Sequence, residues 1–151
     1  MTSWRAPGRP TVSTMIYCAN ADEVIAFAKA VFGASLKRKP LRRQDGTFWN
    51  AELTIGDSMI MIAEAEANGP SLAGFVYVYT EDADAIYQKA LDAGAQPMVP
   101  LEDQFYGDRA GGVQDPQGNI WWIATHQRAL DDDALVAAAR AFEAAKAGAQ
   151  Q

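Results

Sequence analysis

Residues 110–126, AGGVQDPQGNIWWIATH, contain two predicted strands and the turn that joins them. Asp115-Pro116-Gln117-Gly118 is a run of turn-forming residues. The segments on its two sides, Ala110 to Gln114 and Asn119 to Thr125, have the length and composition of strands. This stretch therefore predicts an antiparallel pair of strands.

The residues before this pair predict three further elements. A strand from Gly74 to Thr80 is followed by a helix from Asp82 to Ala93, which Gly94 ends, and by a strand from Gln96 to Pro100. The second half of the chain thus has the predicted order β-α-β-β-β.

The first half of the chain predicts the same order. A helix from Ala21 to Phe32 has its apolar residues at helical spacing, with Asn20 as the predicted N-cap and Gly33 as the stop. The predicted strands around it are Thr11 to Cys18, Ser35 to Arg42, Thr47 to Ile55 and Ser58 to Ala63.

Matching positions in the two halves indicate an internal repeat. Gly33-Ala34 corresponds to Gly94-Ala95, and Met61 corresponds to Trp122, in both cases at an offset of 61 residues. We expect a flexible lead-in over residues 1–10, one domain over 11–127 made of units 11–66 and 74–127, and a C-terminal helix with its tail over 128–151.

Composition excludes several classes of protein. The chain has 151 residues, 49% of them hydrophobic, with a net charge of −6, one Cys and one His. It is long enough to bury a core, and its apolar runs are too short to span a membrane. Its acidity argues against nucleic-acid binding, and its lone Cys against disulfides and zinc fingers. We expect a cytoplasmic protein, in which the basic stretch Lys37–Arg43 is either a solvated strand edge or a patch that steers anions.

The repeat and three motifs resemble the vicinal oxygen chelate superfamily, the group of glyoxalase I, extradiol dioxygenases and bleomycin-resistance proteins. The motifs are Phe105-Tyr106-Gly107-Asp108-Arg109, the Asp-Pro-x-Gly turn and Trp122-Ile123-Ala124-Thr125-His126. Together with the extra C-terminal helix they are most similar to the PhnB-like branch. The resemblance implies an α+β fold of two tandem βαβββ units in a curled mixed sheet with a concave cavity, and a homodimer.

The resemblance also assigns four metal-ligand places, one on the first and one on the last strand of each unit. They fall on Ser13, Met61, Phe75 and Trp122, where metal-dependent members have His, Gln or Glu. A hydroxyl, a thioether, a phenyl ring and an indole are poor ligands for divalent cations. We therefore expect a lost metal site, no cofactor, and no metal-dependent glyoxalase or dioxygenase activity.

Strand alternation predicts what lines the cavity instead. If those four residues face inward, so do other aromatic residues and methionines two positions away. We expect a small, flat, aromatic ligand, and net charge −6 favours a cation over an anion. The alternative is that these side chains only pack the core. The predicted ligand-binding residues are Tyr17, Met61, Phe75, Tyr77 and Trp122.

Two residues are candidates for catalysis. Glu52 is the one carboxylate predicted inside and could serve as a general base, or it could be a structural group bonded to Tyr17, Asn50 or a backbone amide. Arg109 could bind a ligand anion, or it could pair with Asp108 to anchor a loop. His126 is expected to be an exposed or capping residue.

Three functional hypotheses follow. The first is a metal-free protein that binds an aromatic compound. The alternative is a metal-independent lyase or isomerase that uses Glu52 as its base and Arg109 or a tyrosine hydroxyl to stabilise an oxyanion. The third is an interaction protein that works through its sheet edges and its C-terminal helix.

Overall fold

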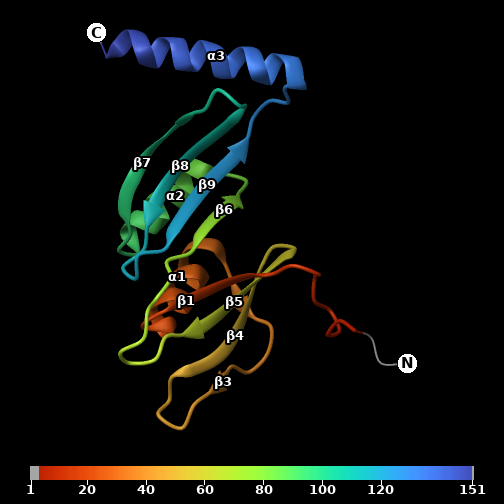
Figure 1. The fold of residues 1–151 in the computed structure, drawn as a ribbon, viewed down its shortest axis with the longest axis vertical. Coiled ribbons are helices and arrows are strands. Elements are labelled where there is room, and N and C mark those ends of the chain that lie inside the picture. Colours follow the sequence, from red (N-terminus) through yellow and green to blue (C-terminus); the bar gives the residue numbers. More distant parts are fainter. Residues whose placement is uncertain (1–3, 151) are drawn as a thin grey trace.

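The computed structural model describes residues 4–150, so the first three residues of the expected lead-in and Gln151 of the expected tail lie outside the described residues. The chain forms two βαβββ modules and a C-terminal helix (Figure 1). The first module consists of β1 (Thr14–Cys18), α1 (Ala21–Phe32), β2 (Ser35–Leu36), β3 (Leu41–Arg42), β4 (Phe48–Ile55) and β5 (Ser58–Glu64). The second consists of β6 (Phe75–Tyr79), α2 (Ala83–Asp92), β7 (Gln96–Asp103), β8 (Asp108–Gln114) and β9 (Ile120–His126), and α3 (Asp132–Ala149) follows.

Both modules have the same sheet topology if β2 and β3, which both pair with β4, are counted as one broken strand. The first sheet has the order β1-β5-β4-β2, with β3 also paired to β4, and the second has the order β6-β9-β8-β7. The first and last strands of each module are parallel neighbours, and the other pairs are antiparallel. β1 begins at residue 14 and β6 at residue 75, an offset of 61. The predicted fold class and internal repeat are confirmed.

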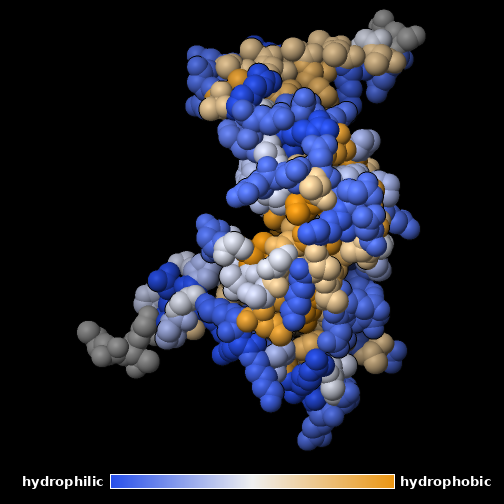
Figure 2. All heavy atoms as spheres, turned by 180° about the vertical axis from the view of Figure 1, so that it is seen from behind, coloured by the Kyte–Doolittle hydropathy of each residue, from blue (hydrophilic) through white to orange (hydrophobic). Residues whose placement is uncertain are grey.

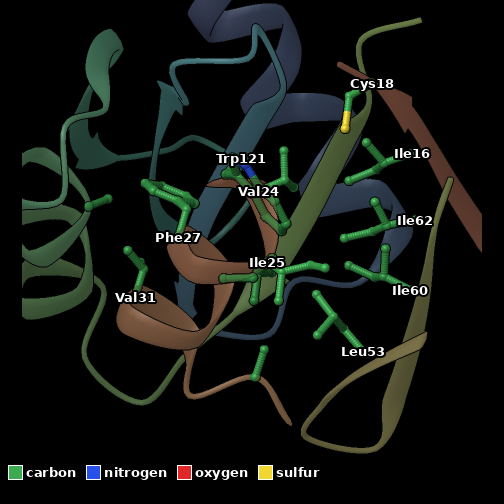
Figure 3. Close-up of a cluster of buried hydrophobic side chains, with 14 of the residues drawn as sticks. Ile16, Cys18, Val24, Ile25, Phe27, Val31, Leu53, Ile60, Ile62 and Trp121 are labelled. Carbon is green, nitrogen blue, oxygen red and sulfur yellow. The ribbon is translucent and has the colours of Figure 1, made fainter. Parts of the chain in front are cut away.

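The core lies on the face of each sheet that carries a helix. Side chains of β1, β4 and β5 pack on α1, where Ile16, Leu53 and Ile62 are fully buried (Figure 3). Trp121 of β9 joins the same cluster, and its ring centroid lies 5.9 Å from that of Phe27 on α1. The two modules therefore share one hydrophobic core, as the alternating strand pattern requires of the helix-facing residues.

The other face of each sheet, called the open face below, carries no helix of the described chain. Its exposed apolar residues include Met15 on the first sheet, and Phe75, Tyr77 and Tyr79 on the second. The strand faces predicted from alternation are thus the observed ones.

Two local predictions are wrong. The predicted strand from Ser35 to Arg42 is broken into β2 and β3, because Pro40 cannot donate a ladder hydrogen bond. Asn20 precedes α1 but adopts a left-handed conformation with φ 51° and makes no side-chain cap. A carboxylate oxygen of Glu64 instead accepts a hydrogen bond from the backbone N–H of Ala21, at 3.2 Å.

The C-terminal helix contacts the rest of the chain only lightly. None of the described residues of α3 is buried. The Phe142 ring lies 5.1 Å from the Phe105 ring, centroid to centroid. Seen from behind, α3 forms a largely apolar bar at one end of the molecule (Figure 2). Among residues 4–150, no helix is long and apolar enough to cross a membrane.

Candidate ligand-binding site

The open face of the second sheet carries a row of aromatic rings. Trp122 on β9 is flanked by Phe75 and Tyr77 on β6, each with its ring centroid 6.4 Å from the indole and nearly parallel to it. The Tyr79 ring continues the row at 5.3 Å from Tyr77. Phe75 is 66% exposed and Tyr79 is 62% exposed. Rings that are stacked on one another yet open on one side can accept a further aromatic ring.

Trp122 has a donor without a partner. Its indole Nε1–H is buried and has no hydrogen-bond acceptor among the described residues. A buried donor without a partner costs free energy, which an acceptor on a ligand or a water would recover. The site therefore contains one directed polar group among its rings.

A buried carboxylate lies at the far end of the aromatic row. Oδ2 of Asp108 accepts hydrogen bonds from the Tyr77 hydroxyl at 2.6 Å and from the Tyr79 hydroxyl at 2.9 Å. Oδ1 of Asp108 lies 2.8 Å from Nδ1 of His126. We call these four residues the Asp108 cluster.

Charge and hydrogen bonding set the ionisation of the cluster. Burial disfavours the Asp108 carboxylate, but the hydrogen bonds from Tyr77, His126 and Tyr79 outweigh burial and hold the pKa of Asp108 below its ordinary value. Burial, and then the hydrogen bond to Asp108, raises the pKa of Tyr77. The hydrogen bond to Asp108, and then burial, raises the pKa of Tyr79. Asp108 is thus an anion and both tyrosines are neutral at neutral pH.

A groove lies beside this face. It has a volume of about 840 Å³ and is lined by residues of both modules, among them Met59, Phe32, Tyr77 and Tyr79. A volume of this size falls within the range of small-molecule sites in proteins. The groove runs from the exposed rings of β6 toward the first module.

The predicted ligand-binding residues divide between the two sheets. The structure brings Phe75, Tyr77 and Trp122 together on the second sheet. Tyr17 on β1 and Met61 on β5 belong to the first sheet, where Met61 is the neighbour of Met15 on one side and of Glu52 on the other.

Glu52 is held by two arginines. Its side chain is 2% exposed and forms ion pairs with Arg9 of the N-terminal segment and with Arg38, whose Nη2 lies 3.0 Å away. The Lys37 ammonium also contacts the backbone oxygen of Gly8 in this segment. Residues 8–9 of the expected lead-in are thus in contact with the first sheet. The expected partners of a structural Glu52, which were Tyr17, Asn50 or a backbone amide, are replaced by guanidinium groups.

Arg109 lies on the helix-facing side of β8. Its guanidinium forms two hydrogen bonds to Asp84 of α2, at 2.7 and 2.8 Å, and one to Asp103 at 3.2 Å. The expected pairing of Arg109 with Asp108 is wrong, because consecutive strand residues point to opposite faces and Asp108 points to the open one.

The sequence analysis missed the Asp108 cluster. The hydroxyls of Tyr77 and Tyr79 both donate to Asp108. The alternation that places Trp122 on the open face also places His126 there, four residues later on the same strand. Strand alternation could therefore have predicted that His126 lies on the open face. The sequence spacing of the two residues does not predict that Asp108 lies opposite His126.

The four positions that correspond to the family's metal ligands do not carry side chains that bind metal ions. Ser13, Met61, Phe75 and Trp122 offer one hydroxyl, one thioether and two aromatic rings, which do not fit a divalent cation. Within residues 4–150, no group of three or more His, Cys, Asp or Glu side chains is arranged to hold a metal ion.

Two βαβββ modules of equal topology, each with an open face, define the class of the fold. Residues 11–123 match the model of the Glyoxalase/Bleomycin resistance protein/Dioxygenase superfamily. The protein Rv0887c of Mycobacterium tuberculosis is 32% identical over 141 residues, which cover 85% of this chain and 82% of that protein. The chain belongs to this superfamily, the vicinal oxygen chelate group.

Solved structures agree with this assignment. TioX from Micromonospora sp. ML1 is 26% identical, with a TM-score of 0.59 over 76% of this chain and 98% of that one. A PhnB protein from Bacillus cereus is 19% identical, with a TM-score of 0.60 over 77% of this chain and 99% of that one. The second similarity shows a shared fold.

Proposed function

We propose that this protein binds a small aromatic compound on the open face of the second sheet, without a metal ion. The observation that carries the proposal is the aromatic row, in which Phe75 and Tyr77 stack beside Trp122, Tyr79 meets Tyr77 edge-on, and the three β6 rings are exposed. Burying such rings against a flat ligand contributes favourable free energy, and each ring contact adds about 0.5–1.5 kcal/mol beyond the buried area.

The position of the core argues against the alternative that the rings on the open face only pack the core. Trp121, Ile123 and Val78 fill the helix-facing side of the second sheet and complete the core there. The rings on the open face have no helix to pack against within the described chain. They are available for a ligand, a second copy of the chain, or both.

Charge favours a cationic aromatic ligand over an anionic one. The net charge of −6 attracts cations, and the row of rings can bind a cation on its faces.

Calorimetry with two tricyclic aromatic probes of opposite charge, 9-aminoacridine and anthracene-9-carboxylate, tests this proposal. We expect saturable binding of the cation, weaker binding of the anion, and loss of cation binding in Phe75→Ala. Trp49→Ala, which removes an exposed ring on the first sheet, serves as the matched control and should leave binding unchanged. The aromatic site would be disproved if neither probe bound, or if Phe75→Ala and Trp49→Ala behaved alike.

The metal-free part of the proposal has its own test. Metal content should be measured on protein purified without added ions and without a metal-binding tag. We expect substoichiometric nickel, zinc, manganese and iron, because the four inherited places lack suitable donors. One equivalent of any of them would contradict the proposed loss of the site.

We further propose that the working protein is a homodimer in the cytoplasm. Open faces with several exposed apolar side chains are a typical dimer surface, and the lone buried Cys18 needs no oxidising compartment. Analytical ultracentrifugation over a range of concentrations should give twice the chain mass of 16.3 kDa. A sedimenting species of single-chain mass at all concentrations would refute the dimer.

The alternative, a metal-independent lyase or isomerase, depends on Glu52. Its ion pairs with Arg9 and Arg38 favour a structural role for this carboxylate. Arg109 has its guanidinium bound to Asp84 and Asp103 on the helix-facing side. Turnover that disappeared in Glu52→Gln while binding survived would support the enzyme instead.

A further inference from the structure

His126 stands at the end of the aromatic row with a buried anion behind it. It is the single histidine of the chain, and its side chain is 56% exposed, whereas that of Asp108 is 3% exposed. The 2.8 Å contact joins Nδ1 of His126 to Oδ1 of Asp108. A side chain this exposed adds little to the core, so the contact mainly orients the imidazole ring.

The hydrogen-bond pattern determines which ring nitrogen carries the proton. An ionised carboxylate only accepts hydrogen bonds, and Oδ2 of Asp108 already accepts from two tyrosine hydroxyls. Nδ1 of His126 must therefore be the donor to Oδ1. In the neutral imidazole Nε2 is then an acceptor, and no residue of the range 4–150 is hydrogen-bonded to it.

Backbone geometry fixes this arrangement. Gly107 has φ 102°, and a Cβ atom at this position would lie 2.3 Å from the backbone oxygen of Arg128. The backbone N–H groups of Gln127 and Arg128 both donate to the oxygen of Gly107. The glycine thus brings the start of β8 against the end of β9, which aligns Asp108 with His126.

We propose that Nε2 of His126 accepts a hydrogen bond from a hydroxyl group on the aromatic ligand, so that the site selects phenols. This inference rests on the proposed function and names the substrate class of the same site. The ring of the phenol lies against Tyr77 and Tyr79, and its O–H points at the imidazole.

The tautomer of the free protein is the first test. Because the chain has one histidine, the imidazole nitrogen signals in a ¹⁵N NMR spectrum are unambiguous. In basic solution we expect Nδ1 to carry the proton and Nε2 to be unprotonated. We expect Asp108→Asn to weaken this preference for one tautomer. A dominant Nε2–H tautomer in the unmodified protein would overturn the proposal.

Binding of 4-nitrophenol and 4-nitroanisole is the second test, because the two probes differ only in the hydroxyl hydrogen and the methyl group that replaces it. We expect the phenol to bind about tenfold more tightly, as one hydrogen bond allows. His126→Ala should remove this preference and retain nitroanisole binding, while Gln127→Ala should change neither.

The outcomes separate this inference from the proposed function. Equal affinity for the two probes, or a preference that survives in His126→Ala, refutes the role of His126 and leaves the aromatic site standing. Failure of both probes to bind refutes the aromatic site and this inference together.

Discussion

Gly112 on β8 lies directly against the indole ring of Trp122 on β9. The two residues are register partners, and a Cβ atom on Gly112 would lie 2.8 Å from Cε3 of Trp122. The absence of a side chain at residue 112 lets the large ring lie down on the sheet between Phe75 and Tyr77. Gly112 thus determines how closely the Trp122 ring approaches the sheet.

Gly112→Ala is therefore expected to displace Trp122. Overpacking of this kind costs about 1–3 kcal/mol in the free energy of unfolding. The change should also shift the Trp fluorescence spectrum and weaken 9-aminoacridine binding. Gly148→Ala, at a position with no atom within 4 Å of the added methyl group, is the control. An unchanged spectrum and affinity in Gly112→Ala would show that the ring does not depend on this glycine.

The Asp108 cluster predicts a pH dependence of stability. The pKa of Asp108 in the folded protein lies below its ordinary value of 3.8. A carboxyl group with a lowered pKa stabilises the fold above its unfolded pKa, and this contribution is lost as the pH falls through the folded pKa. Asp108→Asn should be less stable than the unmodified protein by about 2 kcal/mol at neutral pH.

Denaturant unfolding at several pH values measures this difference. It should stay constant above about pH 5 and shrink as the pH falls below the ordinary pKa of a carboxyl group. Asp84→Asn is a useful comparison, because the pKa of this exposed carboxyl is lowered mainly by its hydrogen bond to Arg109. A pH-independent difference for Asp108→Asn would contradict an ionised Asp108.

Cys18 should be unreactive in the folded protein. Burial, and then the negative charges of Asp115 and Glu64, raise the pKa of its thiol to about 11. At pH 8, three pH units lower, about one thiol in a thousand is a thiolate, and burial excludes the reagent as well. A colorimetric thiol assay should show slow modification that becomes rapid in denaturant. Rapid modification of the native protein would place Cys18 at the surface.

Removing the charge of Glu52 should destabilise the fold through Arg9 and Arg38. Glu52→Gln leaves both guanidinium groups without their anion, but Arg38 is 63% exposed and can turn to water. We therefore expect a cost of about 1–3 kcal/mol, below that of a fully buried broken pair.

The matched control is an exposed ion pair in the same module. Arg42 pairs with Asp22 at 3.2 Å with both side chains largely exposed, so Asp22→Asn should cost less than about 1 kcal/mol. Thermal unfolding of the two acid-to-amide variants measures the difference. If Glu52→Gln cost no more than Asp22→Asn, the buried pair would have no structural role.

Local sequence signals were sufficient for the architecture. The helix from Ala21 to Phe32 matches α1 at both ends, because its apolar spacing and its terminal glycine are properties of the segment itself. The alternation that put Trp121 on the helix-facing side and Trp122 on the cavity side holds for the same reason, since it follows from strand geometry. Strand ends moved by a few residues where pairing extended them, as in β7.

The sequence by itself determined the doubled βαβββ order and the face of the sheet on which the predicted strand residues lie. Only the tertiary structure decided that Asp108 joins Tyr77, Tyr79 and His126, that Arg109 turns to Asp84, and that Arg9 reaches Glu52. Periodicity follows from one segment's own geometry, whereas these contacts join strands, helices and a terminal segment whose relative positions depend on the packing of the whole chain.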